Sequence, residues 1–79
     1  MKRYITHVRK DDKDNIIAVK TYELTLTILE VVERINQEVD KFYVPLDLIN
    51  VSVGVYKERW IRTYADGKWT NNLDNLPSF

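Results

Sequence analysis

The side chains best suited to bind a partner lie in a short segment near the C-terminal end of the sequence. Trp60, Arg62 and Tyr64 occupy alternate positions, and alternate side chains of a β-strand point to the same face. Asp66-Gly67 is a strong turn signal, so we expect the chain to turn back and bring Trp69 beside them. Because Trp, Tyr and Arg dominate the energetics of protein interfaces, this spacing predicts an aromatic and Arg binding surface.

A structural interpretation of the same segment is also open. Trp60 and Tyr64 would then pack beneath a helix, and Arg62 would pair with Asp66 or with backbone carbonyls to hold the C-terminal segment. A buried polar network of this kind would also include Asn72. The candidate binding residues are Trp60, Arg62, Tyr64, Asp66, Trp69 and Asn72.

Residues for catalysis or metal binding are scarce. The chain has one histidine, His7, no cysteine and no glycine-framed serine, so no residue stands in a sequence context typical of a hydrolytic nucleophile. Its two glycines cannot form a phosphate loop or a dinucleotide fingerprint. Asp12 and Asp14 lack the glycine and the distal Glu of a calcium loop. We therefore expect no catalytic residue, no metal, no cofactor and no enzymatic activity.

Length and composition limit the class of protein. Residues 1–79 are expected to form a single small domain, since a chain of 79 residues buries only about 60% of its unfolded surface. No apolar run approaches the roughly 18 residues of a membrane span, and the charged N-terminal end lacks a secretory signal. The absence of cysteine is typical of a reducing compartment, so we expect a cytoplasmic protein with no membrane contact.

One helix is predicted, from Thr27 to Phe42, because apolar residues recur there at helical spacing. Thr27 and Glu30 form a capping-box signature at its start. We expect Ile35 to be buried against a sheet, and the acidic excess of residues 21–47 to lie on the solvated side of the helix.

The rest of the chain reads as strands and turns. Residues 3–8 and 16–20 predict a hairpin, with a bulge near His7 or cover on both faces, since Ile5 and Val8 cannot both face one side of a regular strand. Residues 51–56 and 59–65 alternate as two further strands, Lys57-Glu58 is a turn by position only, and 68–70 is a short return. Residues 42–44 run into Pro45, which permits only a short or edge strand, and 21–26 read as a connection. The expected fold is α+β, with an antiparallel sheet of four to five strands and one amphipathic helix on one face, in the order β-β-α-β-β-β.

The C-terminal run WIRTYADGKWTNNLDNLP resembles the ending of a family of small bacterial and phage proteins, domain of unknown function 3892. This chain ends in Ser78-Phe79 where members often have a cysteine. The family has no established activity, so the resemblance implies only a complete, self-standing domain. The residues that carry it are Trp60, Ile61, Arg62, Thr63, Ala65, Asp66, Asn72, Leu73, Leu76 and Pro77.

Two functional classes remain. The first is a small protein-interaction domain, with a phage or mobile-element origin and a homodimer both left open, that binds an unknown protein partner. The second is a nucleic-acid-binding domain in which Trp69 or Tyr56 stacks on bases. Zero net charge favours the first class, as do the acidic residues Asp11, Asp12 and Asp14 that interrupt the N-terminal basic cluster. The phosphate contacts of the second class would come from Lys2, Arg3, Arg9, Lys10, Lys13, Arg59 and Lys68.

Overall fold

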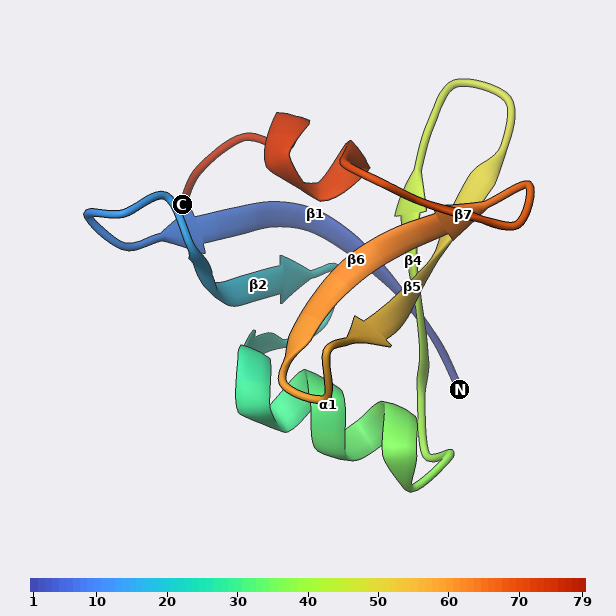
Figure 1. Ribbon diagram of the computed structural model, residues 1–79, viewed down its shortest axis with the longest axis horizontal. Helices are drawn as coiled ribbons and strands as arrows, with labels where there is room; N and C mark the ends of the chain where they lie inside the picture. The colour runs from blue at the N-terminus through green and yellow to red at the C-terminus, as the bar shows by residue number, and fades with distance from the viewer.

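The computed structural model describes residues 1–79 and has an α+β fold, with one α-helix, a short 3₁₀-helix and a seven-stranded sheet (Figure 1). The expected class is therefore confirmed. The elements are β1 (Lys2–Lys10), β2 (Ile16–Thr21), β3 (Thr25–Thr27), α1 (Ile28–Asn36), β4 (Lys41–Pro45), β5 (Asn50–Tyr56), β6 (Trp60–Ala65), β7 (Lys68–Thr70) and η1 (Asn72–Asn75).

The sheet differs from the expected one in size and in direction. Its order is β3-β2-β1-β4-β5-β6-β7, and β1 pairs with β4 in parallel while every other pair is antiparallel. The prediction of four to five strands, all antiparallel, was wrong. Two of the three residues of β3 lie within 21–26, which were expected to be a connection because so short a strand shows no period. The short return expected at 68–70 is β7, and β4, expected to be a short or edge strand, is short but lies inside the sheet between β1 and β5. The parallel pair joins segments separated by a crossover through β2, β3 and α1, which leaves no local signal.

The helix α1 begins as predicted and ends earlier. Thr27 accepts a hydrogen bond from the Glu30 amide at 3.2 Å, and the Glu30 carboxylate accepts one from the Thr27 amide at 2.9 Å, so the capping box is confirmed. The chain leaves the helix after Asn36, because Glu38 takes a left-handed conformation with φ of 57°. Phe42, expected to end the helix, is instead a buried residue of β4.

The apolar stripe of α1 also lies slightly differently from its prediction. Val31 is fully buried, whereas Ile35 is only half-buried and packs at the margin of the core. Val39, beyond the end of the helix, is 51% exposed. The prediction that Ile35 is buried was therefore wrong in degree, because the short helix directs its deepest residues to its first two turns.

A bulge lets β1 bury both Ile5 and Val8, whose side chains would point to opposite faces of a regular strand. The register with β2 shifts between Ile5 and His7, and both Ile5 and Val8 have no exposed surface. The bulge expected near His7 is confirmed. Its effect is that β1, a central strand, contributes to the core along most of its length.

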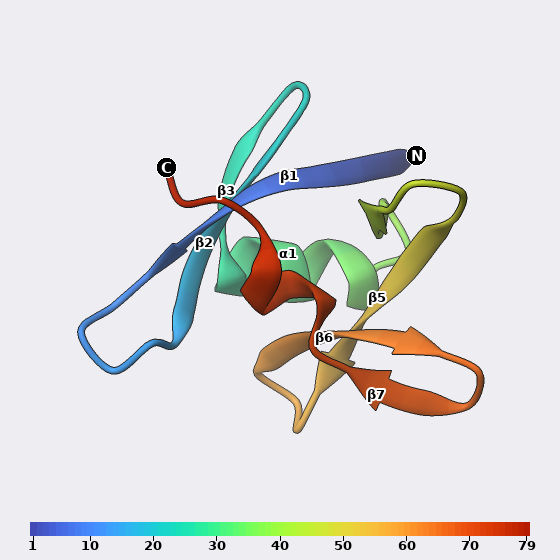
Figure 2. The ribbon, with the colours of Figure 1, turned by 90° about the horizontal axis from the view of Figure 1, so that it is seen from above.

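The sheet curls around one core, which is closed at its two ends by α1 and η1. Figure 1 places the two helical elements at opposite ends of the molecule, and η1 lies in front of α1 in the view from above (Figure 2). Leu73 of η1 belongs to the same buried cluster as Val31 of α1. Beyond η1, the Val8 amide donates to the Pro77 carbonyl at 3.0 Å, which fastens the C-terminal segment to β1.

Two tight turns connect the last three strands. Asp66 and Gly67 have φ of 53° and 76°, and Lys57 and Glu58 have φ of 51° and 67°. Asp66 and Gly67 are the two central residues of a tight hairpin turn, because Ala65 pairs with Lys68. The β5–β6 turn has three residues, because Tyr56 pairs with Trp60, so Arg59 lies in the turn and not in the strand as expected. Both turns lie where they were predicted, although Lys57-Glu58 lacks the Gly or Asn that usually adopts this conformation. Neither helix of the structure is long and apolar enough to span a membrane.

Candidate binding site on the open sheet face

Strand alternation divides the sheet into a covered and an open face. The face that points into the core carries Val53 and Ile61, which are 7% and 6% exposed. The opposite side of the strands β1, β4, β5, β6 and β7 has no helix over it, and we name it the open face. Its members are Lys2, Tyr4, Lys41, Tyr43, Ser52, Gly54, Tyr56, Trp60, Arg62, Tyr64 and Trp69.

An aromatic row crosses this open face. In the register of the sheet Tyr4 pairs with Tyr43, Tyr43 with Ser52, Ser52 with Tyr64, and Tyr64 with Trp69. Since adjacent strands lie about 4.8 Å apart, the row extends over about 19 Å across five strands. The rings of Tyr4 and Tyr43 are 5.8 Å apart, and those of Tyr64 and Trp69 are 5.1 Å apart. We call these five residues the aromatic row.

Trp69 is held in place from three sides. Its ring meets those of Tyr64 and Tyr56 edge to face, with the Tyr56 centroid at 5.2 Å. A Cβ atom placed on Gly54 would lie 3.1 Å from Cη2 of Trp69, so the indole occupies the space that the glycine leaves. Any larger residue at position 54 would therefore press on the indole. Trp69 nevertheless remains 41% exposed.

Arg62 lies beside the aromatic row and belongs to no ion pair. Its guanidinium carbon is 4.6 Å from the centroid of the Tyr56 ring, and Nη1 donates to Oδ1 of Asn71 at 3.3 Å. The alternative in which Arg62 pairs with Asp66 was wrong, because Asp66 lies in the β6–β7 turn. Tyr64 is 44% exposed and does not pack beneath the helix. The structure thus brings Arg62, Tyr64 and Trp69 together.

Trp60 lies at the far end of β6 from the aromatic row. It pairs with Tyr56 in the register and is half-buried, with the Arg59 guanidinium 5.5 Å from its ring centroid. It is therefore on the predicted face, although it touches neither Tyr64 nor Trp69 in the aromatic row.

Asn72 and Thr63 form a clamp on the covered side of the sheet. The backbone amide of Asn72 donates to Oγ1 of Thr63 at 3.1 Å, and Nδ2 of Asn72 donates to Oγ1 of Thr70 at 3.2 Å. The two threonine hydroxyls are 2.6 Å apart, and Thr63 has no exposed surface. The clamp fixes η1 to the last two strands. Asn72 therefore has a structural contact and does not lie on the open face.

Sequence reasoning missed the N-terminal half of the aromatic row. Tyr4 and Tyr43 join it only because β1 and β4 pair in parallel, and Tyr22, 69% exposed, adds a further ring 6.1 Å from Tyr4. The residue types were visible in the sequence. The pairing that aligns them with Tyr64 was not.

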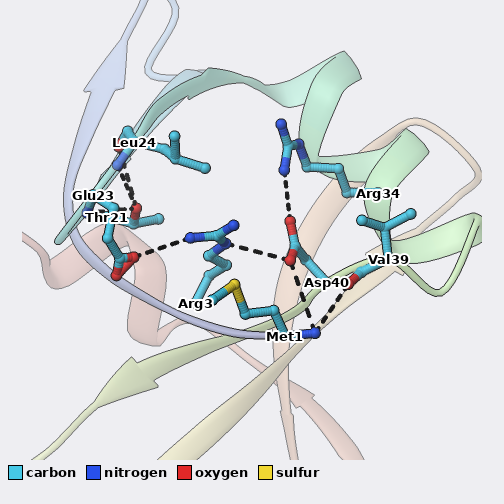
Figure 3. A network of polar contacts seen from close by, with 8 residues as sticks. All are labelled: Met1, Arg3, Thr21, Glu23, Leu24, Arg34, Val39 and Asp40. Carbon is cyan, nitrogen blue, oxygen red and sulfur yellow. Dashed lines mark hydrogen bonds and ion pairs between the residues drawn. The ribbon is translucent and has the colours of Figure 1, made fainter.

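A buried carboxylate forms a second polar cluster, on the helix side (Figure 3). Asp40 accepts a hydrogen bond from Nη1 of Arg34 at 2.7 Å, and its other oxygen is 3.3 Å from Nε of Arg3. Arg3 also pairs with Glu23 at 3.1 Å, and the amino group of Met1 lies 3.9 Å from the Asp40 carboxylate. The cluster joins β1, the end of α1 and the start of β4.

The charges around Asp40 determine its ionisation. Burial by itself raises the pKa of the Asp40 carboxyl, but the hydrogen bond from Arg34 and the charge of Arg3 outweigh burial and hold this pKa below its ordinary value. The carboxylate therefore stays ionised and paired within the chain. We assign the cluster a structural role.

A hollow of about 290 Å³ lies between the β1–β2 turn, β6 and η1, and its lining includes Asp14, Trp60 and Arg62. The lining contains no His, Cys or Ser, and its carboxylates come from Asp14 and Asp74. No cluster of three His, Cys, Asp or Glu side chains is placed to hold a metal ion.

Together these features define a small α+β domain whose sheet carries a core on one face and an open aromatic face on the other. The family model described as protein of unknown function (DUF3892) matches residues 4–77, so the chain belongs to this family. The resemblance inferred from the C-terminal motif is thereby confirmed. No curated protein and no solved structure matches the chain.

Proposed function

We propose that this chain is a cytoplasmic, non-enzymatic protein-interaction domain of bacterial or phage origin that binds a protein partner with its open face. The observation that carries the proposal is the aromatic row across five strands. Two of its members, Tyr64 and Trp69, stay 44% and 41% exposed although they pack against each other. Tyr, Trp and Arg are the residues that protein interfaces concentrate at their centres.

Rigidity of the rings supports the same function. Trp69 is held by Gly54, Tyr56 and Tyr64, so its side chain has little rotamer freedom left to lose on binding. Ordering a flexible side chain at an interface costs roughly 0.5–1.5 kcal/mol, and a fixed aromatic avoids this cost. The open face is therefore preorganised for a partner.

The β4–β5 turn extends the same surface beyond the strands. Leu48 is 96% exposed and Ile49 is 61% exposed, and the strand that follows leads directly to Ser52 in the aromatic row. A standard interface takes about 800 Å² from each partner, more than a row of five side chains provides. The turn supplies the additional apolar contact.

The nucleic-acid alternative is less well supported by the same geometry. Bases stack on free ring faces, but the rings of Tyr56, Tyr64 and Trp69 meet edge to face, and Arg62 already covers Tyr56. The chain also has zero net charge. Binding to generic DNA or RNA is expected to be weaker than about 10⁻⁴ M near physiological salt.

A capture experiment tests the proposal. The wild-type domain, Tyr64→Ala and the helix-side control Leu29→Ala would each be immobilised and exposed to a lysate of the source organism. Leu29 is 67% exposed on α1, so its substitution leaves the fold and the open face unchanged. We expect a protein retained by wild type and by Leu29→Ala and lost from Tyr64→Ala, with circular dichroism confirming that all three are folded. Equal retention by Tyr64→Ala, or retention of nucleic acid alone, would overturn the proposal, and sedimentation of the free domain would reveal a homodimer.

A further inference from the structure

Charge is distributed unequally between the two sides of the molecule. Lys2, Lys41 and Arg62 belong to the open face, and no Asp or Glu occupies any of its strand positions. Exposed carboxylates lie instead on α1, at Glu30 and Glu33, although the chain as a whole is neutral. Glu38, after α1, lines the same hollow as Lys41 and Tyr43. The carboxylates at the margin of the open face lie in turns. Lys57 and Arg59 flank Glu58, and Lys68 lies two residues after Asp66, whereas Asp47 has no basic residue in the β4–β5 turn.

The three cations of the open face have no acidic partner within the chain. Lys2 lies 6.0 Å from the centroid of the Tyr43 ring, and Arg62 donates only to the neutral amide of Asn71. Every ion pair of the structure involves other cations, namely the amino group of Met1 and the side chains of Arg3, Lys10 and Arg34. The positive charge of the open face is thus left available for an external carboxylate.

We infer that the partner bound by the open face is a protein that presents an acidic surface with an apolar pocket. This inference rests on the proposed function and adds the chemistry of the partner to it. Carboxylates opposite Lys2, Lys41 and Arg62 would form charge-assisted hydrogen bonds and steer the encounter. Across the aromatic row from these carboxylates, an apolar pocket would take Leu48, which is 96% exposed in the β4–β5 turn at the opposite end of β4 from Lys41.

A protein fits this surface better than a nucleic acid does. Three cations are few compared with the roughly six to ten phosphate contacts of a typical nucleic-acid complex. Two of them already lie over tyrosine rings, at Tyr43 and Tyr56. An apolar side chain such as Leu48 gains most from an apolar pocket, which folded proteins provide and a phosphate backbone does not.

Selection from a random-peptide library displayed on phage tests the inference with a defined probe. We expect the wild-type domain to enrich peptides of net negative charge that contain a large apolar residue. Ser52 provides a matched pair of variants, since it is exposed, central in the aromatic row and free of side-chain hydrogen bonds. Ser52→Lys should keep or strengthen binding of an enriched peptide, whereas Ser52→Glu should weaken it about tenfold or more. Leu48→Ser should also weaken it, without changing the unfolding midpoint.

NMR shift mapping of an enriched peptide separates the possible failures. Acidic peptides that shift Tyr43, Ser52 and Tyr64 support the inference. Neutral or basic peptides that shift the same residues would overturn the inference about the partner's charge but would still support the open face as the binding surface. Peptides that shift Leu29 and Glu33 on α1 would overturn the proposed function as well. Absence of enrichment, equal binding by both Ser52 variants, or micromolar binding of oligothymidylate would each overturn the inference.

Discussion

The two faces of the same strands differ in what surrounds them. Phe42 and Tyr43 are adjacent in β4, yet Phe42 is 1% exposed in the core while Tyr43 belongs to the aromatic row. Thr63 and Tyr64 show the same contrast in β6, at 0% and 44% exposed. Because side chains alternate, this small domain encodes its fold and its proposed binding surface in interleaved positions. Substitutions on the open face should therefore change stability little, and substitutions on the covered face should act mainly on stability.

The largest difference is expected for the neighbours Phe42 and Tyr43. Phe42→Ala should lower the free energy of unfolding by about 3–5 kcal/mol, because it empties the centre of the core. Small domains are stable by only about 5–15 kcal/mol in total, so this variant should be close to unfolded. Tyr43→Ala, which loses a half-buried ring and its contact with Tyr4, should cost about 1–2 kcal/mol. Urea unfolding measures both, and equal midpoints would show that the two faces are not distinct.

Substitution of Asp40 tests the buried polar cluster on the covered side of the sheet. Asp40→Asn should cost about 3 kcal/mol near neutral pH, because it leaves the charges of Arg3 and Arg34 without their buried partner. The pKa of Asp40 is lower in the folded than in the unfolded protein, so its contribution to stability is fully present above the ordinary value of 3.8 and is lost as pH falls through the folded value. The stability difference between wild type and Asp40→Asn should therefore shrink in acid. The exposed turn variant Asp47→Asn serves as control, and a difference that does not depend on pH would refute this assignment.

The clamp at Thr63 should have a smaller effect. Thr63→Val keeps the shape of the side chain but removes the acceptor of the Asn72 amide, which should cost about 1–3 kcal/mol. Thr25→Val, on the exposed edge strand β3, should change stability by less than about 0.5 kcal/mol. Thermal unfolding of the pair measures the difference. If the two variants have the same melting temperature, the attachment of η1 does not depend on the clamp.

Gly54→Ala should have the smallest effect on stability and a specific effect on the open face. The new Cβ would press on Trp69, while alanine suits a strand better than glycine, so the net change should stay within about 1 kcal/mol. In a Trp60→Phe background, Trp69 fluorescence should shift to the red as the indole is displaced toward solvent. Ser52→Ala, the preceding residue on the same face, should leave the emission unchanged. An unchanged spectrum for Gly54→Ala would mean that Trp69 does not rest on the glycine.

Local signals in the sequence predicted local structure well. The capping box of Thr27 and Glu30, the bulge at His7 and the turn at Asp66-Gly67 depend on residues close together in the chain, and all three are confirmed. The end of α1 was misjudged because Phe42 continues the helical spacing by coincidence, after the left-handed residue Glu38 has ended the helix. No residue type signals that ending, since Glu rarely adopts this conformation.

The candidate site was predicted only where its residues are close together in the chain. Arg62, Tyr64 and Trp69 come from one hairpin, so alternation and a turn signal were enough to place them together. Tyr4 and Tyr43 enter the aromatic row through the parallel pairing of β1 and β4, which a single sequence does not encode locally. The motif that carries the family resemblance includes Thr63 and Asn72, and both lie in the clamp and not on the open face.

The proposed binding mode places the open face, and not the helix side, against the partner. Isotopically labelled domain added to an unlabelled lysate of the source organism tests it most directly, because NMR signals broaden first at the residues that bind. We expect selective broadening of Tyr43, Ser52, Tyr64 and Trp69, whereas Leu29 and Glu33 on α1 should remain sharp. The broadening should be lost in Ser52→Glu. Broadening centred on α1, or none at residues of the aromatic row, would contradict it.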